Sequence, residues 1–321
     1  MKESRQLSAL SRQKSAGLLG RQRLLKASQC ILLILVLPII SRAADTGCPV
    51  NGSDESKITV NGYTVRTMRS EFFGCVEVSK NGAVVYREAD DLRYFIGNDI
   101  QGEGKVPSIK PGTNITGGRD PQVLIGSWSG GAHCCFKFRL LELGSKFRKL
   151  AELDAADGDY AHFEDLDKDG KYEFVGNDWT FAYWETSFAE SPAPKVILRP
   201  TTDKEGRVEY SLATDLMQRP APPPEETRKL VAKIKSNDEW SDGVPSALWS
   251  AILDFIYSGH PDLAWQIWNE TWPESKPAKG GFLGAFCDRL TQSPYFFELT
   301  KTINSAPPDC FSISRGAATE K

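Results

Sequence analysis

A proline-rich stretch at residues 218–224 divides this chain of 321 residues into two parts with different sequence periodicities. Before it, β-branched and aromatic residues alternate with polar ones, and Asn61-Gly62 and Asn81-Gly82 have the composition of hairpin turns. Beyond it, apolar residues recur at helical spacing, as in 245–257, where Pro starts the segment and Gly follows its end. We predict an α+β fold of two domains, an antiparallel β domain at 44–217 and a small helical bundle at 225–305, followed by a tail at 306–321.

The first 43 residues have the pattern of an export signal. A basic segment leads into the apolar run 31–40, which is shorter than the roughly 20 residues of a membrane span. Small residues at Ser41 and Ala43 suit a signal peptidase, and an uncleaved anchor is the alternative. We expect a mature chain that starts at Ala44, lies in the periplasm or outside the cell, and has no membrane span after cleavage.

Cleavage at that point makes the chain strongly acidic. The full chain has a formal net charge of −3, and residues 1–43 hold eight Lys or Arg and one Glu, so the mature chain carries about −10. Such a chain lacks the basic surface that binds nucleic acid or an anionic membrane. We expect neither as a partner.

Six cysteines remain after cleavage, and an even number in an exported chain predicts up to three disulfides. The six are Cys48, Cys75, Cys134, Cys135, Cys287 and Cys310. Cys287–Cys310 is the favoured pair because both lie in the C-terminal part, and Cys48–Cys75 is the second candidate. Cys134 and Cys135 would then bond as neighbours, which requires a local turn because adjacent side chains on a strand point to opposite faces. Metal binding is the alternative, although no CxxC spacing supports it.

The segment Asp165-Leu-Asp167-Lys-Asp169-Gly170-Lys-Tyr-Glu173 carries the strongest functional signal. Carboxylates at alternate positions can converge on one point if the backbone turns sharply at the glycine, and Ca²⁺ takes six to eight oxygen ligands. An EF-hand would have helices on both sides and Glu at the twelfth position, but that position is Gly176 and the flanking segments have the composition of strands. The alternative to an ion site is a solvated acidic turn.

The spacing D-x-D-x-D-G-x-x-E between strands resembles the calcium loop of FG-GAP or VCBS-type repeats, which are known from β-propellers of secreted bacterial proteins. The resemblance covers about residues 118–215. It implies that Asp165, Asp167 and Asp169 supply side-chain oxygens, Lys171 a backbone carbonyl, and Glu173, where the family usually has Asp, the closing carboxylate. The strand-rich part is too short for the four or more blades of a propeller, so we expect propeller-like strands without a closed ring.

Two further clusters are candidates for function. The segment 126–130 misses the G-x-S-x-G spacing of a serine nucleophile by one residue, so we assign no catalytic residue there. Trp179, Tyr183 and Trp184 closely follow the acidic segment and form a candidate ligand surface, because loops often carry function.

These features predict an exported, calcium-stabilised binding or interaction module whose partner is a protein or a glycan. One alternative is a metal-dependent hydrolase in which an ion held by the acidic segment activates water. Another is a structural subunit of an envelope complex that docks through the helices at 225–305.

Overall fold

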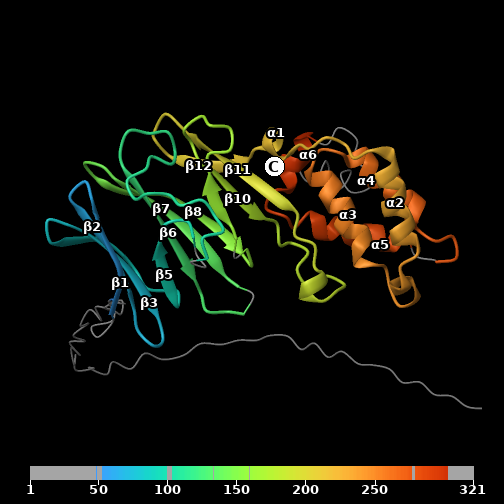
Figure 1. Ribbon diagram of the computed structural model, residues 1–321, viewed down its shortest axis with the longest axis horizontal. Coiled ribbons are helices and arrows are strands. Elements are labelled where there is room, and N and C mark those ends of the chain that lie inside the picture. The colour runs from blue at the N-terminus through green and yellow to red at the C-terminus, as the bar shows by residue number, and fades with distance from the viewer. Residues whose placement is uncertain are drawn as a thin grey trace, which may run out of the picture. The chain divides into compact units, whose positions relative to one another are not determined.

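The computed structural model describes Cys48 and residues 53–99, 103–132, 134–158, 160–276 and 279–302 (Figure 1). The chain divides into two units, Met1–Asp45 and Thr46–Lys321, and all described residues belong to the second. The predicted signal peptide at 1–43 and the tail at 306–321 lie outside the described residues. Within the described part, every helix is too short or too polar to cross a membrane.

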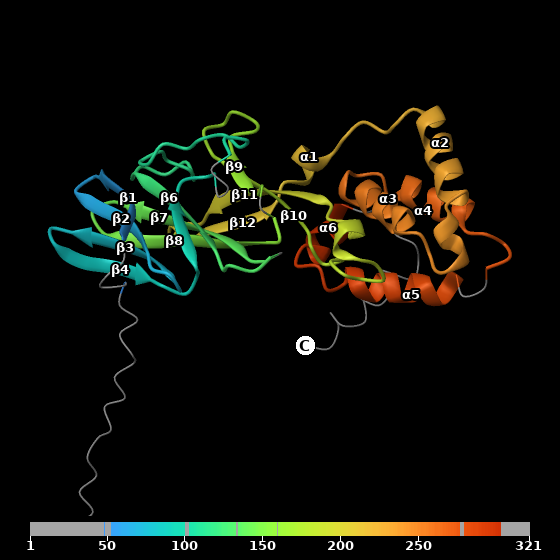
Figure 2. The same ribbon diagram turned by 60° about the horizontal axis from the view of Figure 1, so that its bottom comes forward.

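In the described part of the chain, twelve strands form three antiparallel sheets of four strands each (Figures 1 and 2). The N-terminal sheet contains β1 (Ser53–Val60), β2 (Tyr63–Arg69), β3 (Gly74–Lys80) and β4 (Ala83–Glu88) in that order. The central sheet contains β5 (Arg93–Ile96), β6 (Gln122–Trp128), β7 (Phe136–Leu143) and β8 (Phe147–Ala156). The C-terminal sheet has the order β12-β11-β10-β9, with β9 (His162–Glu164), β10 (Glu173–Asn177), β11 (Lys195–Thr202) and β12 (Val208–Leu212).

The two Asn-Gly pairs form the tight hairpin turns that the sequence predicts. Asn61 and Gly62 join β1 to β2, and Asn81 and Gly82 join β3 to β4. All four residues have positive φ, between 49° and 81°. Asn and Gly tolerate this backbone region, and such turns match the twist of the flanking strands. These hairpin predictions are confirmed.

The central and C-terminal sheets share an aromatic core, and a side-chain amide joins them on the side of β5 and β9. Phe138, Phe163 and Phe174 meet edge to face with ring centroids 5.4–6.0 Å apart. After β5, the side-chain amide of Asn98 donates to the Phe163 carbonyl at 2.8 Å and accepts from the Phe163 N–H at 2.7 Å, which links β5 to β9. On the other side β8 and β12 are both edge strands. The sheets of the described residues therefore form no closed barrel.

Among the residues that the structure describes, six α-helices follow the strands: α1 (Thr214–Met217), α2 (Pro224–Lys235), α3 (Ser246–Tyr257), α4 (Pro261–Thr271), α5 (Lys279–Leu290) and α6 (Phe296–Thr302). Two short 3-10 turns lie at Phe188–Glu190 and Asp238–Ser241. Trp249 of α3 and Phe286 of α5 are buried in one apolar core with Phe181 and with Val196 of β11. The mixed α+β class is confirmed, while independent folding of the two predicted domains stays a prediction.

Two of the disulfides considered from the sequence are present. Cys48 bonds to Cys75 on β3, and Cys134 bonds to its neighbour Cys135 across a cis peptide bond. Cys287 is also disulfide-bonded, and its predicted partner Cys310 lies outside the described residues.

Glu77 on β3 is buried between arginines of the two neighbouring strands. Arg66 on β2 and Arg87 on β4 each place a guanidinium nitrogen 2.7 Å from a different oxygen of the Glu77 carboxylate. Burial alone would raise the pKa of this carboxyl, but hydrogen bonds from Arg87 and Arg66, together with their charge, outweigh burial and lower the pKa. The triad ties three strands together.

Replacing Glu77 by Gln should lower the free energy of unfolding by about 1–3 kcal/mol at neutral pH. Because the folded pKa lies below the unfolded value of about 4.3, the charge contributes stability above that pH and loses it as the pH falls through the folded pKa. Urea unfolding at pH 7 and pH 3 measures the difference, which should shrink at pH 3. Glu71→Gln in the exposed β2–β3 turn is the control, and a pH-independent Glu77→Gln effect would contradict the ion-triad account.

Candidate metal centre

The acidic segment is the loop of a β-hairpin between β9 and β10. Glu164 and Glu173 are paired at its base, so the strand flanks expected from the sequence are present. Gly170 has φ of +84°, the left-handed backbone that the sharp turn requires. Its N–H donates to the Asp165 carboxylate at 3.2 Å, and Tyr172 N–H donates to the Ile115 carbonyl at 2.9 Å. The loop is thus held from within and from a neighbouring segment.

Three carboxylates of this hairpin converge. One oxygen each from Asp165, Asp167 and Glu173 lies within 4.8 Å of the others. Glu173 is fully buried, and its Oε1 and the Oδ1 of Asp165 are buried without a hydrogen-bond partner among the described residues. An unsatisfied buried oxygen is costly, whereas a hard cation uses such oxygens as ligands. The donor set therefore fits a divalent metal ion.

The charge environment of Glu173 also favours a bound cation. Burial raises the pKa of this carboxyl, and the nearby charge of Asp167 raises it further. A 3.0 Å hydrogen bond from Leu166 N–H and the charge of Arg199 oppose this rise. A cation among the three carboxylates would reduce both the cost of burying a charge and the repulsion between like charges.

Arg199 on β11 places one positive charge beside these three loop carboxylates. Its Nη2 lies 3.1 Å from Asp167 Oδ2, and its Nε lies 3.6 Å from Glu173 Oε1. The same Nη2 lies 3.0 Å from Asp215 Oδ2. Arg199 only partly offsets the three loop carboxylates, so the cluster keeps net negative charge for a metal cation.

No family model, curated protein or solved structure matches this chain. The resemblance to FG-GAP or VCBS-type repeats therefore rests on the loop residues and stays a prediction.

The structure brings together three of the five predicted ligands. Asp169 lies outside the converging group, and its Oδ2 accepts from Lys171 Nζ at 3.0 Å. Hydrogen bonds from the side chain and the backbone N–H of Lys171 lower the pKa of the exposed Asp169 carboxyl. Ligation by Asp169 and by the Lys171 carbonyl stays a prediction. Arg199 was not identified from the sequence, because nothing in its local pattern places it beside a loop 26 residues earlier.

The candidate ligand surface divides between the exterior and the core. Trp179 stacks on Phe188 with ring centroids 5.4 Å apart, and Tyr183, which is 61% exposed, lies 5.3 Å from Phe188. Trp184 instead contacts Trp249 and Phe282, at 5.5 and 5.2 Å. Trp179 and Tyr183 thus share an aromatic group with Phe188, a residue that the sequence did not single out, while Trp184 packs against the helices.

The Ser129–Cys135 segment is closed on itself. Ser129 Oγ accepts from Cys135 N–H at 2.7 Å, and Ser129 N–H donates to the Cys135 carbonyl at 3.1 Å. His133 lies outside the described residues. The Ser129 hydroxyl therefore serves to close this loop.

Proposed function

We propose that this chain is an exported binding or interaction module whose β9–β10 loop holds a structural Ca²⁺ ion. The observation that carries the metal assignment is the convergence of the Asp165, Asp167 and Glu173 carboxylates, of which Asp165 and Glu173 each have a buried oxygen with no hydrogen bond to the described residues. Carboxylate oxygens on a short loop suit Ca²⁺, which accepts flexible geometry, better than Mg²⁺, which demands a near-ideal octahedron. The ion would fasten the hairpin by cancelling carboxylate repulsion.

The side chain beside the three converging carboxylates favours an ion that stabilises the fold over one that activates water for hydrolysis. Metal-activated water needs an open coordination position and usually a nearby base. The side chain beside Asp167 and Glu173 is the guanidinium of Arg199, which cannot act as a base at neutral pH. The export proposal itself is checked by N-terminal sequencing of the secreted chain, which should begin at Ala44.

Saturating Ca²⁺ should stabilise the folded chain by about 2.7 kcal/mol when its concentration is a hundred times the dissociation constant. Thermal unfolding with Ca²⁺ and with a chelator measures this gain, and isothermal titration calorimetry measures binding directly. Asp167→Asn should abolish the gain, whereas Asp203→Asn, in the exposed β11–β12 turn, should keep it. Identical melting in Ca²⁺ and in chelator would reject the metal assignment.

Two further variants sharpen this experiment. Asp169→Asn tests whether Asp169 is a metal ligand. The resemblance to calcium-loop repeats includes Asp169 as a ligand, whereas the group of converging carboxylates excludes it. Arg199→Gln removes the positive charge 3.1 Å from Asp167, so Ca²⁺ should bind about tenfold more tightly. The same variant should be less stable without metal, because the loop carboxylates then lose their neighbouring cation.

A further inference from the structure

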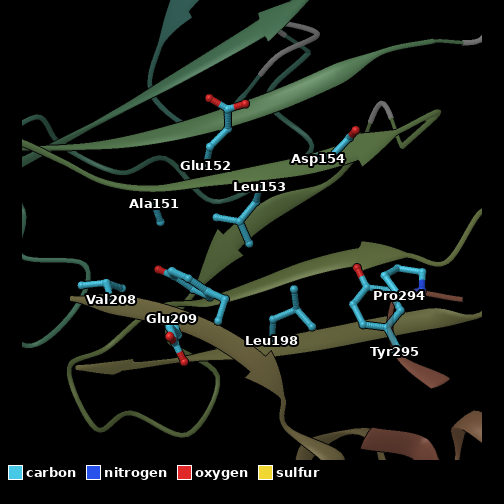
Figure 3. Close-up of a pocket in the computed structure, with 10 residues that line it drawn as sticks. Ala151, Glu152, Leu153, Asp154, Leu198, Val208, Glu209, Pro294 and Tyr295 are labelled. Carbon is cyan, nitrogen blue, oxygen red and sulfur yellow. The ribbon is translucent and has the colours of Figure 1, made fainter. Parts of the chain in front are cut away.

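Two strand edges line one cleft on the side of the core where, among the described residues, no backbone pairing joins the central and C-terminal sheets. β8 is the last strand of the central sheet and β12 the last strand of the C-terminal sheet. Among the described residues, no backbone hydrogen bond joins the two strands. The space between them, here named the β8–β12 cleft, has a volume of about 530 Å³ (Figure 3).

The cleft has defined ends. Arg148 near the start of β8 donates from Nη1 to the Gly206 carbonyl in the β11–β12 turn at 3.2 Å, which ties the two strands together there. At the other end of β12, the Leu212 N–H donates to the carboxylate of Glu298 on α6. Both ends of β12 are therefore held by hydrogen bonds to neighbouring segments.

The backbone of Tyr210 on β12 is directed into this cleft. Tyr210 faces Pro200 on β11, and proline has no N–H with which to form a hydrogen-bonded pair. Leu212, two residues on, also directs its N–H away from β11. Since directions alternate along an antiparallel strand, the N–H and C=O of Tyr210 point outward as well. An exposed edge of this kind is a template for another strand.

The floor of the cleft is apolar. Leu153 of β8 and Leu198 of β11 point toward each other across it, as Figure 3 shows, and are 7% and 6% exposed. Tyr210 and Tyr295 also line the cleft. The Tyr210 hydroxyl is buried without a hydrogen-bond partner among the described residues. A strand lying in the cleft would bury every second side chain on this floor.

The rim of the cleft is acidic. The charged residues that line it in the described part of the chain are all carboxylates: Glu152, Asp154 and Glu209. Glu152 and Asp154 point away from the floor on β8 (Figure 3). Glu152 is paired with Lys149 and Arg139, whereas Asp154 and Glu209 are exposed and form no ion pair with the described residues. Outward side chains of a strand lying there would therefore meet unpaired negative charge from both sides.

We propose that the β8–β12 cleft binds an extended polypeptide segment in which apolar residues alternate with Lys or Arg. The segment pairs its backbone with Tyr210, lays apolar side chains on Leu153 and Leu198, and directs cationic ones toward Asp154 and Glu209. β12 is five residues long, so a bound segment of about that length fills the edge. The inference rests on the proposed role as a binding module and names the class of its partner.

The test uses the full mature chain and fluorescently labelled peptides. An eight-residue peptide of alternating Lys and Val should raise the fluorescence anisotropy on titration, and the matched Glu-Val peptide should not. Methylating alternate backbone nitrogens of the Lys-Val peptide removes the donors that pair with the strand edge while keeping its charge, and should weaken binding at least tenfold. Asp154→Asn and Glu209→Gln should each weaken binding about three- to tenfold, and Glu205→Gln in the β11–β12 turn is the matched control.

Several outcomes would overturn the proposal. Equal binding of the methylated peptide would mean non-specific electrostatic attraction, and equal binding of the Glu-Val peptide would remove the charge argument. A dimer in sedimentation that Glu209→Gln dissociates would assign the cleft to a second copy of the chain. Titrations with Ca²⁺ and with a chelator separate the two proposals, because a calcium-dependent rise in melting temperature without peptide binding rejects the cleft alone.

Discussion

Replacing Asp178 with Ala should lower the free energy of unfolding by about 3 kcal/mol. This carboxylate is 3% exposed and lies where the segment after β10 meets the helices. It accepts hydrogen bonds from Ser293 Oγ at 2.5 Å, from the Tyr257 hydroxyl of α3, and from Thr180 N–H at 2.8 Å. Alanine would leave buried hydroxyls without an acceptor, and each such group costs about 1–3 kcal/mol.

The variant should loosen the contact between helices and strands in particular. Burial and the Asp178 carboxylate raise the pKa of the Tyr257 hydroxyl well above its ordinary value, so this group is a protonated donor at neutral pH. Without its acceptor, the C-terminal end of α3 should lose amide hydrogen-exchange protection. Equilibrium unfolding in urea, followed by tryptophan fluorescence, measures the stability change.

The control for Asp178 is an aspartate whose ion pair is exposed. Asp254 on α3 pairs with Arg219, and both side chains are more than half exposed. Asp254→Ala should therefore change stability by less than about 1 kcal/mol. If Asp178→Ala costs no more than Asp254→Ala, the buried hydrogen bonds of Asp178 do not stabilise the helix–strand contact.

Replacing Arg139 with Met should cost about 3–5 kcal/mol, because it breaks a buried ion cluster from one side. Arg139 on β7 is 2% exposed and pairs with Glu88, while its Nη2 lies 3.4 Å from Asp91 Oδ2. Its Nη1 also donates to Ser127 Oγ at 2.6 Å. Methionine fills a similar volume but leaves Glu88 and Asp91 without their cation, while Glu152 keeps its pair with Lys149.

A second substitution distinguishes lost charge from lost packing. Adding Asp91→Asn to the Arg139→Met chain removes one of the uncompensated carboxylates, so it should recover part of the stability. Arg207→Met is the control, since Arg207 is 73% exposed and its pairing with Asp203 is of the weak surface kind. Failure of the second substitution to recover any stability would show that packing, not charge, dominates.

Local features of the sequence predicted local features of the fold. Asn-Gly pairs specified two hairpins because few other residues accept positive φ at both turn positions. In segment 245–257, Pro245 directly precedes α3 (Ser246–Tyr257), so the helix start predicted from this proline is right to within one residue. The acidic loop could also be predicted from local sequence, because the three converging carboxylates all lie within the nine residues 165–173.

Contacts between segments that are far apart in the sequence could not be predicted from local sequence. Trp184 has the same local pattern as Trp179, yet it packs against Trp249 of α3, 65 residues later. Periodicity shows which face of an element is apolar but not which element covers it. Asn98 likewise links β5 to β9 through a side chain in an unremarkable loop.

The sequence by itself determined the α+β class, the hairpin turns, the helix starts and the acidic loop, because each depends on residues within a few positions of one another. Only the tertiary structure placed Arg199 beside that loop, buried Arg139 and Asp178 among their partners, and left β8 and β12 facing a shared cleft. These depend on which strands and helices meet across long sequence separations. Backbone pairing and side-chain burial decide that jointly, and no short segment encodes it.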